Sequence, residues 1–257
     1  MGEMNMTNKK SNTHTNRATS YDIGRPNYPD TFFEYLYDLF NGATSIIIAD
    51  IGAGTGKVTK RFLDMGNKVF AVEPDNDMMG ILKANLALSP NLTILETSAE
   101  NTGLASNSVE LIFCGNSYMW FDREYVVPEF QRIVKNHKIP NIVIARLGAG
   151  SDAYAEELLE IGKKFAKAAS DRIPNNVMPF QEGMYTEKVF KYSIFQSYNE
   201  FLHGFLSASY APTAEDDCFE NYCSALRFIF DKYSVNGKIE GNFILSCYVG
   251  RVENLMM

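Results

Sequence analysis

The feature that most constrains the fold is a short apolar segment that runs directly into a cluster of glycines. Residues 45–50 read SIIIAD, and positions 52, 54 and 56 are all glycine. A continuous β-branched run of this length is typical of a strand that is buried on both faces of a parallel sheet. Glycine is favoured where a chain turns sharply from strand to helix, or where a ligand approaches bare backbone. The segment therefore predicts a strand, a tight turn and a helix in succession.

The same alternation of strand and helix continues through the first 150 residues. Strand, helix and strand at this spacing indicate βαβ units with right-handed crossovers and helices on both faces of the sheet. A helix over 30–40 precedes the first strand. The remaining elements predicted in this part are helices at 57–65, 75–88 and 123–135, and strands at 68–73, 92–96, 109–114 and 141–147.

The regular alternation of strand and helix ends beyond residue 150. The elements predicted there are helices at 153–169, 199–207 and 215–233, and strands at 188–197 and 242–249. Together with the earlier elements, they predict an α/β fold of the Rossmann-like, doubly wound type. We expect a mostly parallel, seven-stranded sheet with an inserted helical cap near the C-terminus.

The domain organisation follows from the absence of repeats and low-complexity linkers. Residues 1–20 are polar and lack an apolar segment, so they are predicted to form a mobile N-terminal tail and not a signal peptide. Residues 21–257 are expected to form one domain, with a helical insertion at 199–235.

Charge and composition exclude several classes of protein. Lys and Arg total 24 and Asp and Glu total 31, which gives a net charge of −7 and argues against nucleic acid as a partner. No apolar stretch approaches the roughly 18 residues that span a bilayer. The four cysteines form no CxxC pair, so neither a disulfide framework nor a metal site is indicated. We expect a cytoplasmic monomer or homodimer with no membrane partner.

The glycine spacing separates the possible nucleotide-binding motifs. A phosphate-binding P-loop needs four residues between its first glycine and a Gly-Lys pair, but only three separate Gly52 from Gly56-Lys57. The dinucleotide fingerprint would place its third glycine at position 57, which is Lys57, so that interpretation is weakened but stays open. Glu73 lies at the end of the second predicted strand, where a carboxylate can accept hydrogen bonds from ribose hydroxyls.

Several segments together resemble the class I S-adenosylmethionine-dependent methyltransferases, and most closely the small-molecule, methyltransferase type 11-like branch. The Asp50-x-Gly-x-Gly-x-Gly spacing is the feature that separates this family from NAD enzymes. The other segments that carry the resemblance are Tyr21…Arg25-Pro-x-Tyr28-Pro29, Glu73-Pro-Asp-x-x-Met78, Ser98-Ala-Glu100, Asn116-Ser-Tyr-Met-Trp-Phe-Asp122 and Gly237-Lys…Tyr248-Val-Gly250.

The resemblance implies S-adenosyl-L-methionine as the cofactor and assigns residues to it. The glycine segment would hold the methionine part with Asp50 beneath it, Glu73 would accept from the ribose, and Arg25 would pair with the cofactor carboxylate. The full set of implied cofactor residues is Tyr21, Arg25, Asp50, Gly52, Ala53, Gly54, Gly56, Glu73, Pro74, Met78, Ser98, Ala99, Glu100 and Asn116.

Two positions depart from the pattern of the family. The segment 135–140 replaces the usual Pro-Gly-Gly turn before the fifth strand, which affects the local fold. Met119 stands where a histidine often precedes Trp-Phe-Asp, which puts the substrate chemistry in doubt.

The implied activity is methyl transfer to a small-molecule acceptor by in-line displacement, for which positioning supplies most of the rate. No catalytic dyad stands out. Tyr28, Tyr118 and His203 are weak catalytic candidates, and Tyr28, Tyr118 and Trp120 are candidate walls of the substrate pocket. Two alternatives stay open at this point, a non-catalytic S-adenosylmethionine-binding regulatory module and an NAD-linked oxidoreductase.

Overall fold

A computed structural model describes residues 11–40, 42, 45–135, 140–165 and 178–257. The chain divides into two compact units, each assembled from three segments. The sheet unit comprises residues Asn27–Gly150, Arg172–Ser193 and Asn242–Met257. The helical unit comprises residues Met1–Pro26, Ser151–Asp171 and Ile194–Gly241. Each unit is described by itself below.

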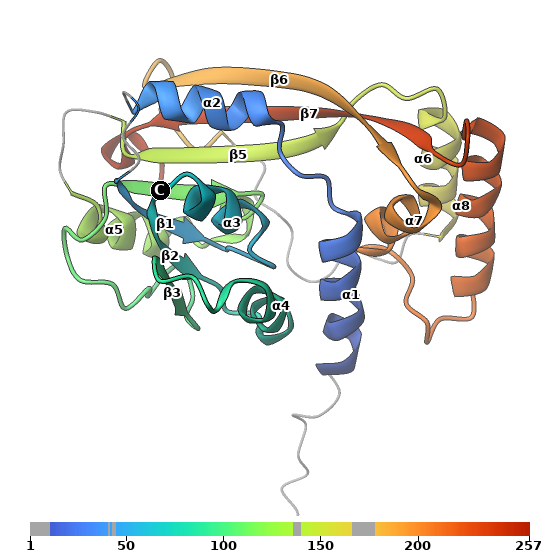
Figure 1. Cartoon of the computed structure of the whole chain (residues 1–257), viewed down its shortest axis with the longest axis horizontal. Coiled ribbons are helices and arrows are strands. Elements are labelled where there is room, and N and C mark those ends of the chain that lie inside the picture. Colours follow the sequence, from blue (N-terminus) through green and yellow to red (C-terminus); the bar gives the residue numbers. More distant parts are fainter. Residues whose placement is uncertain (1–10, 41, 43–44, 136–139, 166–177) are drawn as a thin grey trace, which may run out of the picture. The chain divides into compact units, whose positions relative to one another are not determined.

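A seven-stranded sheet with the strand order β3-β2-β1-β4-β5-β7-β6 organises the fold (Figure 1). β1 pairs in parallel with β2 and β4, β2 with β3, and β4 with β5, whereas β7 is antiparallel to β5. The sheet confirms the predicted α/β fold of the Rossmann-like type. Its strands are β1 (Ile47–Ile51), β2 (Lys68–Val72), β3 (Leu92–Leu95), β4 (Leu111–Gly115), β5 (Ile142–Ala149), β6 (Tyr185–Gln196) and β7 (Ile239–Gly250).

Helices cover both faces of this sheet, and successive residues of each strand face opposite sides. On one face, Phe32 and Leu36 of α2 (Asp30–Leu39) and Phe62 of α3 (Lys57–Asp64) pack on alternate residues of β1, β4, β5 and β7. Figure 1 shows α2 lying along the strands β5, β7 and β6. On the other face, the apolar side of α5 (Arg123–Ile133) packs on the remaining alternate residues, among them Ile144. Two separate apolar layers therefore fix the sheet.

A helix, α4, and a 3₁₀ helix lie next to the carboxyl ends of the parallel strands. α4 (Asn76–Leu86) follows β2, and its N-terminal N–H groups are capped by the Asp75 carboxylate, which accepts from the backbone N–H groups of Asp77 and Met78. A 3₁₀ helix, η1 (Tyr118–Trp120), follows β4. Open α/β sheets bind their ligands at this edge. A second 3₁₀ helix, η2 (Val252–Asn254), follows the antiparallel β7, whose last residue pairs with the first residue of β5, and so lies at the opposite edge.

The helical unit has an apolar core of its own. It contains α1 (Ser11–Gly24), α6 (Ala155–Phe165), α7 (Tyr198–Leu206) and α8 (Phe219–Tyr233). A capping box formed by Ser197 and Glu200 begins α7. The core combines aromatic and aliphatic side chains, of which the most deeply buried are Phe201, Leu226, Ile229, Ala211 and Ile239.

The N-terminal segment differs from its prediction. Residues 11–20 belong to α1 and not to a mobile tail, while residues 1–10 lie outside the described residues. α1 buries the small residues Ala18 and Ser20 in place of large apolar side chains. Hydrophobic periodicity detects large apolar residues, so it gives no signal for a helix of this kind.

The predicted domain boundaries also differ from the units. One domain was expected over 21–257, whereas the sheet and helical units interleave along the chain. The predicted insertion at 199–235 contains most of α7 and all of α8. Residues 136–139, in the unusual turn before β5, and residues 166–169, at the end of the helix predicted over 153–169, lie outside the described residues. Among the described helices, none combines the length and apolar character needed to cross a membrane.

Candidate functional site

The turn between β1 and α3, residues 52–56, is called the glycine loop here. Gly52, Gly54 and Gly56 have φ values of 72°, 59° and 85°, in the left-handed region that side chains other than glycine rarely adopt. A Cβ added at Gly52 would lie 2.5 Å from the Cβ of Ser117, and one added at Gly56 would lie 2.9 Å from Leu86 Cδ1. Backbone conformation and packing within the protein therefore both require glycine at these two positions.

The N–H groups of this loop are largely used inside the protein. The backbone nitrogens of Gly52 and Ala53 donate to the carbonyl oxygen of Val72 over 2.8 and 3.1 Å. Gly54 N donates to Glu73 Oε2 over 2.8 Å, and Gly56 N donates to Ala53 O over 3.0 Å. Donors that are already paired are not available to a bound anion. At least four of the five N–H groups of the loop, those of Gly52, Ala53, Gly54 and Gly56, are therefore already paired within the protein.

Glu73 follows the last residue of β2 and connects the loop to the next helix. Its Oε2 accepts from Gly54 N, and its Oε1 accepts from Asp75 N over 2.9 Å. The side chain is 7% exposed, and burial raises the pKa of its carboxyl, opposed in part by the two backbone hydrogen bonds. Each carboxylate oxygen has two lone pairs, so both oxygens can accept a further hydrogen bond.

Asp50, in the fourth position of β1, is a second buried carboxyl near the loop. Its Oδ2 accepts a hydrogen bond of 2.5 Å from Thr59 Oγ1, which ties the strand to the start of α3. Burial raises the pKa of Asp50 to about 7, the Thr59 hydrogen bond opposes this, and the negative charge of Glu73 adds to it. Two acidic groups that repel each other in a buried site are stabilised in their charged forms by a nearby cation.

The segment after β4 meets the glycine loop. Ser117 donates from its Oγ to the carbonyl oxygen of Ile51 over 2.6 Å. Asn116 has a φ of 56°, and its Oδ1 accepts from Leu147 N over 2.8 Å. Its Nδ2 donates to the hydroxyl oxygen of Tyr28 over 3.3 Å. The side chain of Asn116 thereby links Tyr28, which precedes α2, to Leu147 in β5.

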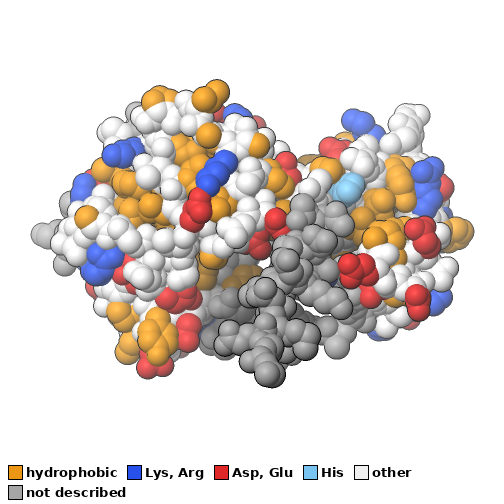
Figure 2. All heavy atoms as spheres, turned by 90° about the horizontal axis from the view of Figure 1, so that it is seen from below, with side chains coloured by type: hydrophobic (Ala, Val, Ile, Leu, Met, Phe, Trp, Pro, Cys, Tyr) orange, Lys and Arg blue, Asp and Glu red, His pale blue; other side chains and the backbone are white. Residues whose placement is uncertain are grey.

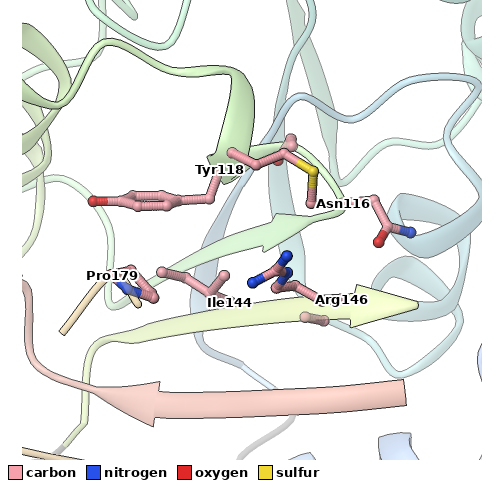
Figure 3. A pocket seen from close by; sticks show the side chains of 8 residues that line it. Asn116, Tyr118, Ile144, Arg146 and Pro179 are labelled. Carbon is pink, nitrogen blue, oxygen red and sulfur yellow. The ribbon is translucent and has the colours of Figure 1, made fainter. Parts of the chain in front are cut away.

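A pocket opens beside this segment, between the end of β4 and the carboxyl half of β5 (Figure 3). The space that it encloses is about 10 Å³, which is room for roughly one water molecule. Figure 3 shows Tyr118 on one side of it and Ile144 and Pro179 on the other, with the guanidinium of Arg146 between β4 and β5. The residues that line the pocket are Asn116, Ser117, Tyr118, Met119, Ile144, Ala145, Arg146 and Pro179.

Most residues predicted to bind the cofactor lie along this edge of the sheet unit. The adenine candidates come from the segments after β2 and β3, where Ala99 is buried and Glu100 Oε1 accepts from Asp122 N over 3.2 Å. Pro74 is exposed, whereas Met78 and Ser98 are half-buried. Tyr21 and Arg25 lie on or next to α1 in the helical unit, with the Arg25 guanidinium 5.4 Å from the centre of the Tyr21 ring. Their roles stay predictions.

The three catalytic candidates differ in their surroundings. Tyr28 is buried and bonded to Asn116, and Tyr118 lines the pocket with a hydroxyl that is buried without a hydrogen-bond partner among the described residues. Burial raises the pKa of Tyr118. His203 lies on α7 in the helical unit, where its Nδ1 is 3.0 Å from Ser20 Oγ. Trp120, a predicted wall residue, is half-buried and does not line the pocket.

Three residues at this site have roles that the sequence analysis did not assign. Thr59 donates a hydrogen bond to Asp50, and Ser117 donates one to Ile51. Arg146 lines the pocket. Arg146 carries a signal that could have been read from the sequence, because a charged residue ends the apolar run of a predicted parallel strand. The bonds of Thr59 and Ser117 depend on tertiary packing.

Basic and acidic side chains are interspersed on the face of the molecule in Figure 2, without a continuous basic patch on that face. All four cysteines are free thiols. Within the described part of the chain, no three His, Cys, Asp or Glu side chains are grouped so that they could hold a metal ion.

Comparison with known proteins gives a consistent family. Residues 49–139 match the methyltransferase domain family. An uncharacterized methyltransferase of Mycobacterium tuberculosis is 34% identical over 116 residues, which cover 45% of each chain. An uncharacterized methyltransferase of Schizosaccharomyces pombe is 28% identical over 207 residues, which cover 77% of this chain and 80% of that protein. The match to the mycobacterial relative thus spans about half of its length.

A solved structure shares the fold. The putative type II methyltransferase from Anaeromyxobacter dehalogenans superimposes with a TM-score of 0.61 at 19% identity, over 89% of this chain and 98% of that one. Its similarity supports the architecture of the sheet and its helices. Residues 49–139 therefore form a methyltransferase domain, which confirms the predicted resemblance to the class I S-adenosylmethionine-dependent methyltransferases.

Proposed function

We propose that the protein binds S-adenosyl-L-methionine at the glycine loop and transfers its methyl group to a small-molecule acceptor. The observation that carries this proposal is the charge of the site. The loop lies between two buried carboxyls, Asp50 and Glu73, and its N–H groups at residues 52, 53, 54 and 56 already donate within the protein. A site of this kind suits a cation with hydroxyl donors better than it suits a phosphate.

The same observation argues against the NAD-linked alternative. A dinucleotide brings a pyrophosphate, which is stabilised by unpaired N–H groups at a helix N-terminus. The N–H groups of Gly52, Ala53, Gly54 and Gly56, which precede α3, are paired with Val72, Ala53 and Glu73. S-adenosylmethionine carries a sulfonium and an ammonium in place of the pyrophosphate, so its positive charges would lie near Asp50, and its ribose hydroxyls would meet Glu73.

The residues present fit this cofactor. Glu73 is placed to accept the ribose hydroxyls, because it is fixed by two backbone hydrogen bonds and keeps lone pairs for more. Asp50 would stabilise the sulfonium end from beneath the loop, with Asn116 near the amino acid end. Met78, Ala99 and Glu100 would border the adenine.

The bound cofactor would supply an activated methyl group, which an electron-rich acceptor atom takes by in-line displacement at carbon. The protein's part is to align the acceptor and to exclude water. Tyr118, Ile144 and Pro179 form apolar walls beside Ser117, which would help to exclude water from that side of the site. Tyr118 keeps its proton at neutral pH, since its ordinary pKa is about 10 and burial raises it further. The pocket lining therefore favours an acceptor whose nucleophilic atom needs no base.

The test combines cofactor binding with methyl transfer. We expect Glu73→Gln to raise the Kd for S-adenosylmethionine roughly 100-fold in calorimetry, because a charge-assisted acceptor for two hydroxyls is lost. Glu96→Gln is the matched control, since Glu96 is an exposed carboxylate after β3 that pairs with Lys83. Wild-type affinity in Glu73→Gln would contradict the assigned ribose site.

Transfer is measured with labelled S-adenosylmethionine and a cellular small-molecule extract. Label in a small product supports the proposal. Tight cofactor binding without any transfer would favour a non-catalytic binding module, and binding of NADH without S-adenosylmethionine would favour an oxidoreductase.

A further inference from the structure

The strand β6 lies at one edge of the sheet. Among the described strands, its one neighbour is β7, and Figure 1 shows β6, in orange, on the outer side of β7. β6 is 12 residues long, about twice the usual length of a strand. Alternate residues of an edge strand direct their N–H and C=O groups outward, where they are a template for another strand. The outer edge of β6 is therefore a surface to which a strand can add.

The part of β6 that belongs to the sheet unit, residues 185–193, is mostly exposed. All four residues of the segment 186–189 are exposed, and Val189 is 44% exposed although its side chain is apolar. Successive residues of a strand face opposite sides of the sheet, so neither face of this segment is covered. An approaching strand can therefore reach the edge over several residues, with an apolar side chain at the middle of the segment 185–193.

Two opposite charges lie at equal distances from Val189. Glu187 precedes Val189 by two residues and Lys191 follows it by two, so the three side chains share one face of the strand. Glu187 also interacts with Tyr248 of β7, which helps to fix its position. Among the described residues, none forms an ion pair with Lys191. The face thus carries an acidic and a basic group placed symmetrically about an exposed valine.

This symmetry selects one way of pairing β6 with a second copy of itself. Two identical antiparallel strands pair about a twofold axis, so the register is defined by the residue at the axis. With Val189 at the axis, Glu187 of each copy lies opposite Lys191 of the other copy, and the two valines face each other between these pairs. With residue 187, 188 or 191 at the axis, like charges would lie directly opposite each other. Within 185–193, the register centred on Val189 is the one that forms opposite-charge pairs.

We propose that β6 pairs in antiparallel orientation with β6 of a second copy about Val189, which joins the sheets of the two copies into one. The backbone groups of the two edges would supply the hydrogen bonds, and the pairs of Glu187 with Lys191 would set the register. The same charges, with Lys188, disfavour slipped registers and strands of other sequence. One strand edge offers less area than the roughly 800 Å² per partner of a standard complex, so we expect a concentration-dependent dimer with a Kd of about 10 µM.

The first test is the mass of the full chain in solution. Sedimentation is measured from about 1 µM to about 200 µM, a range that brackets the expected Kd. We expect the mass to rise with concentration from 28.9 kDa toward twice that value. A monomer at every concentration would overturn the proposal.

Charge-reversal variants test the register. Lys191→Glu should stay monomeric over the whole range, because both cross-strand pairs then bring two carboxylates together, and Glu187→Lys should stay monomeric because they bring two ammonium groups together. An equimolar mixture of these two variants should dimerise again, since every pair then joins a carboxylate of one copy to an ammonium of the other. Lys238→Glu is the matched control, because Lys238 is an exposed lysine in the turn before β7, and this variant should dimerise as the wild type does.

A second rescue keeps the test decisive if the loss of the Tyr248 interaction unfolds Glu187→Lys. Adding Glu187→Gln to Lys191→Glu removes the like charges without placing a lysine on this face, and should restore part of the association. Circular dichroism shows which variants are folded. A dimer that persists in folded Lys191→Glu would mean that another surface joins the copies. Failure of the mixture, or of the Glu187→Gln rescue where Glu187→Lys is unfolded, would overturn the register about Val189.

Discussion

The two units both depend on glycine, but for different physical reasons. In the sheet unit, Gly52 and Gly56 occupy left-handed conformations within a turn of five residues, between neighbouring elements of the chain. In the helical unit, Gly24 at the end of α1 lies against α7, where an added Cβ would be 1.9 Å from the backbone nitrogen of Gly204. The first use combines a left-handed backbone conformation with close packing, and the second is set by the approach of two helices that are distant in sequence.

The two uses of glycine depend on different parts of the sequence. The glycine loop is specified within a short stretch of sequence, from SIIIAD to the start of α3. The packing of α1 on α7 requires two segments about 180 residues apart to bring small residues together. A hydrogen bond between His203 Nδ1 and Ser20 Oγ also links α7 to α1. A substitution of Gly52 should therefore destabilise the sheet unit more than the helical unit, and a substitution of Gly24 should do the reverse.

Gly52→Ala should give the largest effect. The substitution combines a strained positive φ with a Cβ that would lie 2.5 Å from Ser117, and we expect a loss of about 4 kcal/mol of unfolding free energy. Fluorescence of Trp120, the one tryptophan of the chain, follows unfolding of the sheet unit in urea. Gly80→Ala in α4 is the control, because nothing lies within 4 Å of its added Cβ. An equal loss in both variants would contradict the packing argument.

Gly24→Ala should have the next largest effect, confined to the helical unit. The added methyl group meets backbone and not a movable side chain, so overpacking should cost about 2 kcal/mol. Amide hydrogen exchange in α1 and α7 should accelerate, while exchange in β1 and β4 stays as in the wild type. Gly162→Ala in α6, with open space around its added Cβ, serves as the matched control. Wild-type exchange in α1 would show that α1 does not need this contact.

The same contrast explains how much of the fold the sequence reveals. The strands from β1 to β5 and the helices between them were predicted close to their observed bounds, because each carries a local pattern of apolar residues and turn signals. α1 was missed. Its buried face consists of small and polar residues, and only the partner helix, far along the chain, makes that face a contact.

The candidate site shows the same limit on a smaller scale. Asp50, Gly52 and Glu73 were found from spacing alone, and the structure places them at one edge of the sheet. Ser117 was included in the resemblance only as part of a motif, and its contact with the glycine loop depends on β4 lying beside β1. Strand order is not encoded in any one segment, so neighbours across strands could not be derived from the sequence.

The two units also differ in how burial acts on their ionisable groups. Burial raises the pKa of Asp50 in the sheet unit to about 7 and lowers the pKa of His203 in the helical unit. The folded sheet unit therefore binds a proton that the unfolded chain releases between about pH 4 and pH 7. The folded helical unit keeps His203 neutral where the unfolded chain takes up a proton, below about pH 6.5. The two effects on stability have opposite signs.

The smallest expected effect is thus a pH dependence that differs between the units in the absence of cofactor. Between pH 6 and pH 8, the contribution of Asp50 to the stability of the sheet unit should fall by about 1 kcal/mol, as its folded pKa is crossed. The contribution of His203 should instead be retained at pH 8 and decline as the pH falls through its lowered folded pKa.

Urea unfolding followed by Trp120 reports the stability of the sheet unit, and hydrogen exchange in α7 reports that of the helical unit. Asp50→Asn should flatten only the first profile, and His203→Gln only the second. Parallel pH profiles in both units of the wild type would mean that these two buried groups do not govern the stability of the units that contain them.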